Sequence, residues 1–234
     1  MQHRSSGNDF VALLSGGLDS YVAVRMAASR MKFNLAITFD YGQRAAKKEI
    51  DTAARIASEF NAEHKVIEIG WMRDETRTAL VDLHKKIPST DARRVDAKAA
   101  ENAAAVWVPN RNGVFISIAA AFSEARGIGS VIAGFNAEEA MTFPDNSEKF
   151  IKASNLSLSM STMSGVKLLS PTSKMTKAEI ANEFCNLKLD PEKIWCCYFG
   201  KKLLCGRCES CARTIRAFRK TPIWKVIKKR FAER

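Results

Sequence analysis

The chain has 234 residues, of which 46% are hydrophobic and 26% charged, and this globular composition excludes a disordered chain. No apolar run approaches the ~18 residues of a membrane helix, and residues 1–6 show no signal peptide, so we expect a cytoplasmic protein with no membrane partner. The formal net charge is +12, but residues 200–234 hold 12 Lys and Arg against 2 acidic residues, so the excess is C-terminal and we do not expect direct nucleic-acid binding.

The N-terminal part of the chain alternates short apolar runs with helical patterns. Strands are predicted over residues 10–14, 35–39 and 65–69, with helices over about 21–31 and 45–60 between them. This alternation predicts the α/β class, with a doubly wound parallel sheet and right-handed crossovers.

The first predicted strand ends in a glycine-rich turn, Ser15-Gly-Gly-Leu-Asp-Ser20, that leads into a helix. Glycines let backbone N–H groups approach phosphate oxygens, and the helix N-terminus and the hydroxyls of Ser15 and Ser20 add donors. No lysine follows as in a Walker loop, so the turn suits a pyrophosphate better than a clamped γ-phosphate. Asp19 is expected either to orient Mg²⁺ or to cap the helix. The candidate nucleotide-binding residues are Leu14, Ser15, Gly16, Gly17, Leu18, Asp19 and Ser20, with Ser15 and Asp19 also candidates for catalysis.

This turn resembles the signature of the ATP pyrophosphatase (PP-loop) superfamily. Members of that superfamily adenylate a carboxylate or carbonyl oxygen and release pyrophosphate. The resemblance implies an adenine nucleotide alpha-hydrolase-like fold and ATP as the cofactor, but it does not select the other substrate.

Candidate ligand-binding residues also stand near the second strand and before the next helix. Tyr41 and Gln43 follow the strand at 35–39, at the edge where ligands gather in open α/β sheets. Residues 70–106 show no clear pattern, so we expect an irregular excursion beside the sheet. Arg111 follows it, where a guanidinium can hold a phosphate or a carboxylate, and is a candidate catalytic residue.

The predicted order resumes with a helix over about 113–126 and strands over 130–135 and 166–169. A further helix is predicted near 176–185, where Thr176 and Glu179 form a capping box. The polar residues after the strand at 130–135 are expected to face the same crevice as the turn and to bind the cosubstrate; they are Asn136, Glu139 and Asp145.

All six cysteines lie in the last quarter of the chain, and Cys205, Cys208 and Cys211 form two consecutive Cys-x-x-Cys steps. This spacing presents thiolates to one tetrahedral Zn²⁺, and a fourth thiolate from Cys196 or Cys197 closes the shell, so the metal is structural. We choose Cys197, which precedes a tyrosine. Disulfide exchange is the alternative, but it leaves the third cysteine at this spacing unexplained.

We therefore divide the chain into a nucleotide-binding α/β domain, residues 8–190, and a zinc-binding helical segment, residues 191–234. The end of this segment, from Arg216 to Arg234, is expected to form a basic helix whose charges face solvent.

Further short motifs occur in one order with the turn and the cysteines: Asp40-Tyr-Gly-Gln-Arg44, Val108-Pro-Asn-Arg-Asn112, Phe143-Pro-Asp145, Thr176-Lys-Ala-Glu179 and Trp195-Cys-Cys-Tyr198. Together they resemble the 7-cyano-7-deazaguanine synthase family from about Phe10 to Phe218. In that family the cysteine before the tyrosine is a ligand, which supports Cys197. The resemblance implies that 7-carboxy-7-deazaguanine, ammonia and ATP form the nitrile through an adenylated carboxylate and an activated amide. It also implies Mg²⁺, which offsets phosphate charge, and a homodimer.

The chain departs from the commoner family pattern beyond residue 135. Glu139 and Ala140 stand where an Asp and an aromatic residue are expected, and Asn146 and Ser147 replace Cys and Arg. These differences leave open a PP-loop tRNA-modifying enzyme, which the basic terminus favours, and a relative that acts on another acceptor. A zinc-ribbon nucleic-acid module is a third alternative, but it would not need the PP-loop.

Overall fold

The computed structural model describes residues 6–97 and 99–232. Residues 1–5, where no signal peptide was recognised, and residues 233–234, the end of the predicted basic helix, lie outside these ranges. Within the described ranges, no helix is both long enough and apolar enough to cross a membrane.

The centre of the fold is a five-stranded sheet in the order β3-β2-β1-β4-β5, and every neighbouring pair is parallel. The chain therefore starts in the middle, winds outward through β2 and β3, and returns to the other side through β4. This topology confirms the predicted doubly wound parallel sheet, and its switch point lies between β1 and β4. The strands are β1 (Ser6–Leu13), β2 (Lys32–Asp40), β3 (Glu63–Glu68), β4 (Ile128–Ile132) and β5 (Lys167–Leu169).

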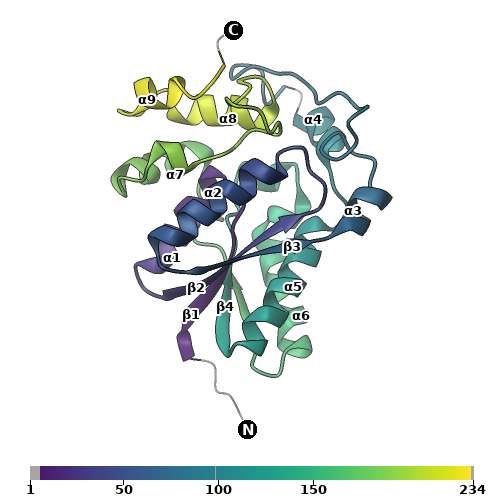
Figure 1. Ribbon diagram of the computed structural model, residues 1–234, viewed down its shortest axis with the longest axis vertical. Coiled ribbons are helices and arrows are strands. Elements are labelled where there is room, and N and C mark those ends of the chain that lie inside the picture. Colours follow the sequence, from purple (N-terminus) through teal and green to yellow (C-terminus); the bar gives the residue numbers. More distant parts are fainter. Residues whose placement is uncertain (1–5, 98, 233–234) are drawn as a thin grey trace.

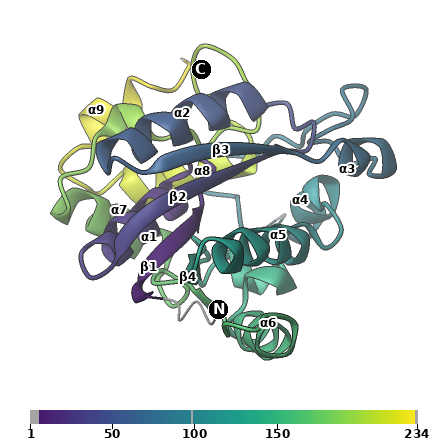
Figure 2. The same cartoon turned by 60° about the horizontal axis from the view of Figure 1, so that its bottom comes forward.

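Helices cover both faces of the sheet (Figures 1 and 2). One face packs against α1 (Leu18–Ala28) and α2 (Ala46–Glu59); α7 (Lys177–Asn186) packs on α1, and α8 (Glu209–Phe218) packs on α7, in the same hydrophobic core. The other packs against α5 (Arg111–Ala125) and α6 (Glu148–Ser161). The remaining helices are α3 (Gly70–Glu75), α4 (Ala99–Val106) and α9 (Trp224–Lys228), with short 3₁₀ turns η1 (Glu139–Met141), η2 (Pro144–Asn146) and η3 (Pro191–Lys193).

This two-sided cover explains why β1 reads as a continuous apolar run. Phe10 and Ala12 point into one core cluster and Val11 into the other, and all three side chains are fully buried. A strand buried on both faces shows no polar alternation.

The structure corrects the prediction in two regions. The excursion predicted over residues 70–106 contains α3 and α4, and the predicted strands at 130–135 and 166–169 are separated by α6, which was not predicted. Leu156 and Met160 are exposed on α6 among polar residues such as Lys152, so the apolar stripe that identifies a surface helix is blurred in its sequence. Ser147 starts α6 by accepting a hydrogen bond from the Phe150 N–H at 3.1 Å.

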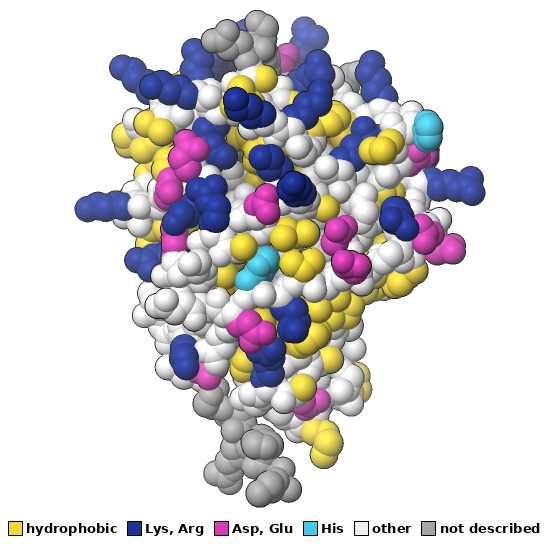
Figure 3. Space-filling view, viewed as in Figure 1, with side chains coloured by type: hydrophobic (Ala, Val, Ile, Leu, Met, Phe, Trp, Pro, Cys, Tyr) yellow, Lys and Arg dark blue, Asp and Glu magenta, His cyan; other side chains and the backbone are white. Residues whose placement is uncertain are grey.

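The basic helix predicted from Arg216 to the C-terminus is wrong as a single helix. It is interrupted between α8 and α9 around Pro222, which has no N–H to donate. Arg216 does not simply face solvent, because its guanidinium pairs with Asp96 and, at 2.6 Å, with Glu138. Figure 3 shows more Lys and Arg side chains on the upper half of this face than on the lower half.

The C-terminal segment packs directly on the glycine-rich turn at residues 15–20. Phe218 of α8 meets Phe184 of α7 edge to face at 5.5 Å. The Trp195 N–H donates to the Gly16 carbonyl at 2.7 Å. The cysteine-rich segment is thereby held beside the loop that ends β1.

Candidate functional site

A pocket of about 270 Å³ opens beside the C-terminal ends of β1, β2 and β4, where ligands bind in open α/β sheets. The loops after these strands, the start of α5 and the C-terminal segment line it. Most of the predicted site residues lie on its wall: Leu14, Ser15, Gly17, Leu18, Asp19, Ser20, Tyr41, Gln43, Arg111, Glu139 and Asp145. Gly16 and Asn136 are not among the residues that line it, and both lie directly beside lining residues in the chain.

Gly16 is required by packing. Its φ of +74° is left-handed, and a Cβ there would lie 2.6 Å from the Thr52 side chain on α2. Gly134 serves a similar purpose after β4, because a Cβ there would lie 2.5 Å from the Ser20 backbone nitrogen. These two glycines let the turn and the start of α1 sit tightly against α2 and the end of β4.

The turn leaves the first N–H groups of α1 available to a ligand. No side chain caps this helix at Gly17. The Ser20 hydroxyl donates to the Gly17 carbonyl at 3.1 Å, and the Gly17 N–H donates to the Ser15 hydroxyl at 3.4 Å. An uncapped helix N-terminus lined by hydroxyls fits an anion.

Lys177, at the start of α7, joins Asp19 of the turn to Glu139 of η1. Its ammonium pairs with Asp19 and donates to Glu139 at 3.0 Å, and its side chain is only 5% exposed. Burial raises the pKa of Asp19 to about 6, although Lys177 opposes the shift. Burial lowers the pKa of Lys177, but the two carboxylates outweigh it and the net shift is upward, so this lysine stays protonated. The second Asp19 oxygen, Oδ1, is buried without a hydrogen-bond partner.

The sequence placed Lys177 only within the motif Thr176–Glu179, and it did not predict the pairing of this lysine with Asp19 and Glu139. A buried lysine is exceptional unless it is paired, but burial cannot be read from a lysine on a helical pattern. The capping box itself is confirmed: Thr176 and Glu179 bond reciprocally. This cap starts α7 one residue before Lys177 and so fixes where the ammonium enters the pocket.

A second ion network connects α8 to the same wall. Arg213, buried on α8, donates to Glu209 at 2.9 Å and also contacts Glu138 and Asp96 at 3.3 Å. Glu138 in turn accepts from the Lys177 N–H at 3.0 Å. The cysteine-bearing helix is thus coupled to the acidic residues of the pocket, a link that sequence spacing did not indicate.

Arg111 and Tyr41 meet across the pocket. The Arg111 guanidinium donates to the Tyr41 hydroxyl at 3.1 Å and lies 5.7 Å from the centre of its ring. Burial raises the pKa of Tyr41. Burial by itself lowers the pKa of Arg111, but Tyr41 and then Asp145 reverse the shift, so the guanidinium stays charged. Burial also raises the pKa of Asp145, while Arg111 acts in the opposite direction.

Two predicted residues make side-chain hydrogen bonds inside the protein, although the Asn136 Nδ2 is buried without a hydrogen-bond partner. The Gln43 amide accepts from the Tyr41 N–H and donates to the Phe39 carbonyl, both at 2.9 Å. The Asn136 Oδ1 accepts from the Glu139 N–H at 2.9 Å. Gln43 therefore shapes the turn after β2, and Asn136 positions η1.

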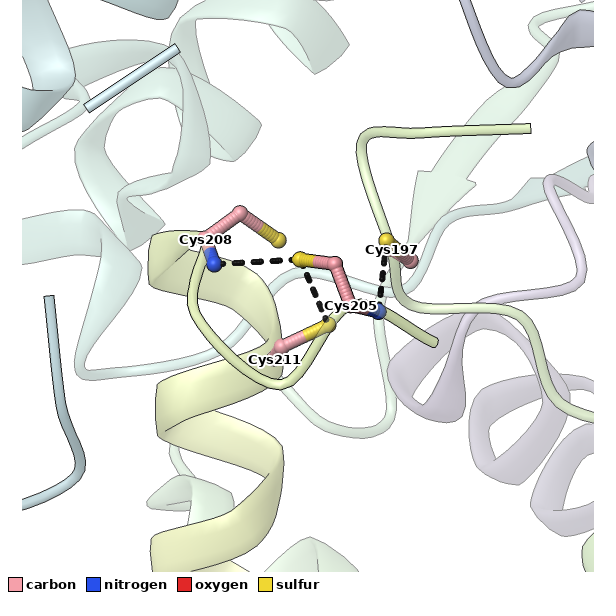
Figure 4. A group of neighbouring side chains, drawn as sticks. All are labelled: Cys197, Cys205, Cys208 and Cys211. Atoms are coloured by element: carbon pink, nitrogen blue, oxygen red, sulfur yellow. Dashed lines mark hydrogen bonds between the residues drawn. The ribbon is translucent and has the colours of Figure 1, made fainter. Parts of the chain in front are cut away.

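Four cysteine sulfurs that do not line the pocket form a cluster of their own (Figure 4). The sulfurs of Cys197, Cys205, Cys208 and Cys211 all lie within 4.8 Å of one another, and those of Cys205 and Cys211 are 3.8 Å apart. Tetrahedral Zn²⁺ with Zn–S bonds of ~2.3 Å needs sulfurs about that far apart, so the set fits the ion. Backbone N–H groups point at two of these sulfurs, from Cys205 to Cys197 at 3.3 Å and from Cys208 to Cys205 at 3.2 Å. Cys196 lines the pocket instead.

Comparison with known proteins identifies the relatives of this chain. The profile of the family described as "Queuosine biosynthesis protein QueC" matches residues 9–222. A 7-cyano-7-deazaguanine synthase from Methanosarcina mazei is 42% identical over 214 residues, which cover 89% of this chain and 93% of the relative. Enzymes of the same name from Desulforamulus reducens and Pelotomaculum thermopropionicum are 47% and 46% identical, covering 89% and 88% of this chain and 92% and 95% of their own lengths.

Proposed function

The chain belongs to the queuosine biosynthesis protein QueC family, and from this premise we propose that it is an ATP-dependent carbon–nitrogen ligase that converts 7-carboxy-7-deazaguanine and ammonia to 7-cyano-7-deazaguanine. The observation that carries the proposal is a single pocket in which the uncapped turn at Ser15–Ser20 shares a wall with Arg111 and Asp145. The pocket thus combines an anion site with a charged pair suited to a polar heterocycle.

The chemistry balances with ATP as the activating substrate. A carboxylate oxygen attacks the α-phosphorus of ATP, and pyrophosphate leaves. Ammonia then attacks the carbonyl carbon of the acyl adenylate, AMP leaves, and loss of a proton from the nitrogen gives the amide. A second adenylation converts the amide oxygen into a leaving group, and loss of AMP and the amide N–H protons leaves the nitrile. Both activation steps need the same arrangement, with the oxygen of the carboxylate or amide group attached to C7 held at the α-phosphate.

We place the ATP phosphates at the turn and the first turn of α1. The open N–H groups and the Ser15 hydroxyl would hold pyrophosphate oxygens, and Lys177, which stays protonated, would offset their charge. Mg²⁺ fits beside Asp19 and Glu139, since Asp19 Oδ1 is buried and unpartnered; when bound, the ion would offset the charge of the leaving pyrophosphate.

We place the deazaguanine base toward Arg111 and Asp145. An ionised carboxylate has only acceptor atoms, so Asp145 complements the N1–H and exocyclic amino donors of a guanine edge. This position would leave the carboxylate on C7, at the opposite end of the bicycle, free to face the turn. Arg111 would balance the Asp145 charge and hold it in place, as the electrostatic coupling between the two implies.

Zinc in the four-cysteine cluster has a structural role in this proposal. Four thiolates complete a tetrahedral shell and leave no position for a substrate. The cluster includes Cys208 and Cys211, which begin α8, and α8 holds Arg213 against the pocket wall. The metal would therefore support the pocket through α8.

A homodimer is also part of the proposal. Leu156 and Met160 on the outer face of α6 are 63% and 76% exposed, an apolar surface that a second copy of the chain would cover. Analytical ultracentrifugation of the wild type and Met160→Lys tests this: a dimer that dissociates in the variant supports it, and a wild-type monomer contradicts it.

The assignment of the two halves of the pocket is tested by separate kinetics for each substrate. Ser15→Ala is expected to raise KM for ATP by roughly 10-fold or more, and Asp145→Asn to raise KM for the base by a similar factor, since a hydrogen bond to a charged group contributes ~1.5–3 kcal/mol. Ser117→Ala, an exposed residue of α5 outside this pocket, is the control and should change neither. The reverse pattern, with Asp145→Asn acting on ATP, would contradict the placement.

A further inference from the structure

Two aromatic rings, Trp107 and Phe143, lie stacked on the wall of the catalytic pocket. Their planes are within 12° of parallel and their centroids are 5.9 Å apart. The stacked pair Phe10 and Phe33, by contrast, is buried in the core, and in the stacked pair Phe39 and Phe115, which also lines the pocket, Phe39 is buried. Trp107 and Phe143 are only partly buried, and both line the pocket.

The backbone holds both rings firmly. Trp107 follows α4 between two buried valines, Val106 and Val108. The Phe143 N–H donates to the Glu139 carbonyl at 2.8 Å, and the Phe143 carbonyl accepts from the Asn146 N–H at 3.1 Å. A pair of aromatic faces fixed in this way loses little conformational entropy when a planar ligand stacks on it.

We infer that Trp107 and Phe143 form a stacking platform that selects a guanine-like bicyclic base, with the neighbouring Asp145 reading its edge. Any purine-like ring offers a π-face, so stacking alone does not distinguish the base from the adenine of ATP. Asp145 makes the distinction, because its carboxylate matches the N1–H and amino donors of guanine but faces a lone pair at N1 of adenine. Asp145 is buried and lies two residues after Phe143, so one short turn holds both the carboxylate that binds the base edge and one ring of the stacking platform.

The inference rests on the proposed function only for the identity of the natural base, and the experiment separates the two. The probe is 7-deazaguanine, which lacks the carboxylate and cannot react, with 7-deazaadenine as the comparison. Binding is measured by calorimetry and by quenching of tryptophan fluorescence. Turnover of 7-carboxy-7-deazaguanine is measured separately.

For wild-type protein we expect binding of 7-deazaguanine with quenching, and much weaker binding of 7-deazaadenine. Trp107→Ala and Phe143→Ala should weaken 7-deazaguanine binding roughly 5- to 150-fold, the range for loss of one base–aromatic stack. KM for ATP should stay unchanged. Trp107→Phe and Phe143→Tyr keep an aromatic face and should restore most of the affinity, which separates stacking from misfolding.

Trp71→Phe is the matched control, because Trp71 is 54% exposed on α3 and does not line the pocket. It should keep both the affinity and the quenching, whereas Trp107→Phe should keep the affinity and lose the part of the quenching that Trp107 contributes, with the rest arising from Trp195, which also lines the pocket. The inference is overturned if wild type does not bind 7-deazaguanine, if the alanine variants bind it normally, or if they raise KM for ATP instead. Platform-dependent binding without nitrile formation would uphold the inference and refute the proposed function.

Discussion

Replacing Lys177 by Met tests whether the buried ion triad organises the pocket. The substitution keeps the length of the side chain but removes the cation between Asp19 and Glu139, whose side chains are 13% and 30% exposed. Removing one partner of a buried ion pair costs about 3–5 kcal/mol, because the remaining charge is left uncompensated. At ~2–4 °C per kcal/mol for a chain of this size, the expected fall in Tm is about 6–20 °C.

The matched control is Lys174→Met. Lys174 also pairs with a glutamate, Glu148 at 3.6 Å, but its side chain is 81% exposed, so the loss should be no more than ~1 kcal/mol. Both variants are measured by urea unfolding followed by circular dichroism. A loss for Lys177→Met as small as that of the control would refute the reasoning.

The pH dependence gives a second test of the triad. The pKa of Asp19 is already raised to about 6 with the lysine in place, above the ordinary value of 3.8 for an aspartate, and removing the cation can only raise it further. A carboxyl with a raised folded-state pKa destabilises the protein above that pKa, and the penalty fades as pH falls toward the unfolded value. The difference between wild type and Lys177→Met should therefore shrink between about pH 7.5 and about pH 5. A difference that does not change over this range would contradict the assignment.

Two further changes test the cysteine cluster and the turn. The Cys208→Ser variant should lose its bound zinc and unfold at a lower Tm. The Cys196→Ser variant, which loses a sulfur outside the cluster, should keep one zinc per chain as measured by elemental mass spectrometry. The reverse result would refute the ligand set. Gly16→Ala should destabilise the protein by clearly more than the ~1–2 kcal/mol expected of Gly165→Ala. Both glycines have a left-handed φ, but a Cβ at Gly16 would also lie 2.6 Å from the Thr52 side chain, whereas a Cβ at Gly165 would have no neighbour within 4 Å. Equal losses of stability in urea unfolding would show that the contact with Thr52 is unimportant.

The local pattern of apolar and polar residues was sufficient to predict those strands and helices whose own sequence shows a clear strand or helix periodicity. The five strands and the helices α1, α2, α5 and α7 were predicted because buried parallel strands read as apolar runs bounded by turns. The helix α6 was missed because the exposed Leu156 and Met160 blur the separation between its apolar and polar faces. Pro222 by itself predicts a helix break, but the closely spaced basic residues on either side of it favoured one continuous helix.

The candidate site was predictable to the extent that its residues follow strand ends. The parallel sheet brings those ends to one edge, so Ser15, Tyr41 and Asp145 meet there although they are far apart in the chain. Lys177, Arg213 and Trp107 were missed as pocket residues, because which face of a helix or loop points inward depends on tertiary packing.

The most direct test of the central claim is mass spectrometry of the products formed by the purified protein from 7-carboxy-7-deazaguanine, ATP, Mg²⁺ and heavy-nitrogen ammonia. The account predicts 7-cyano-7-deazaguanine carrying the heavy nitrogen in its nitrile, with AMP and pyrophosphate formed alongside and Ser15→Ala slowing all of them together. Unchanged carboxylate in the presence of properly folded, zinc-loaded protein would contradict it.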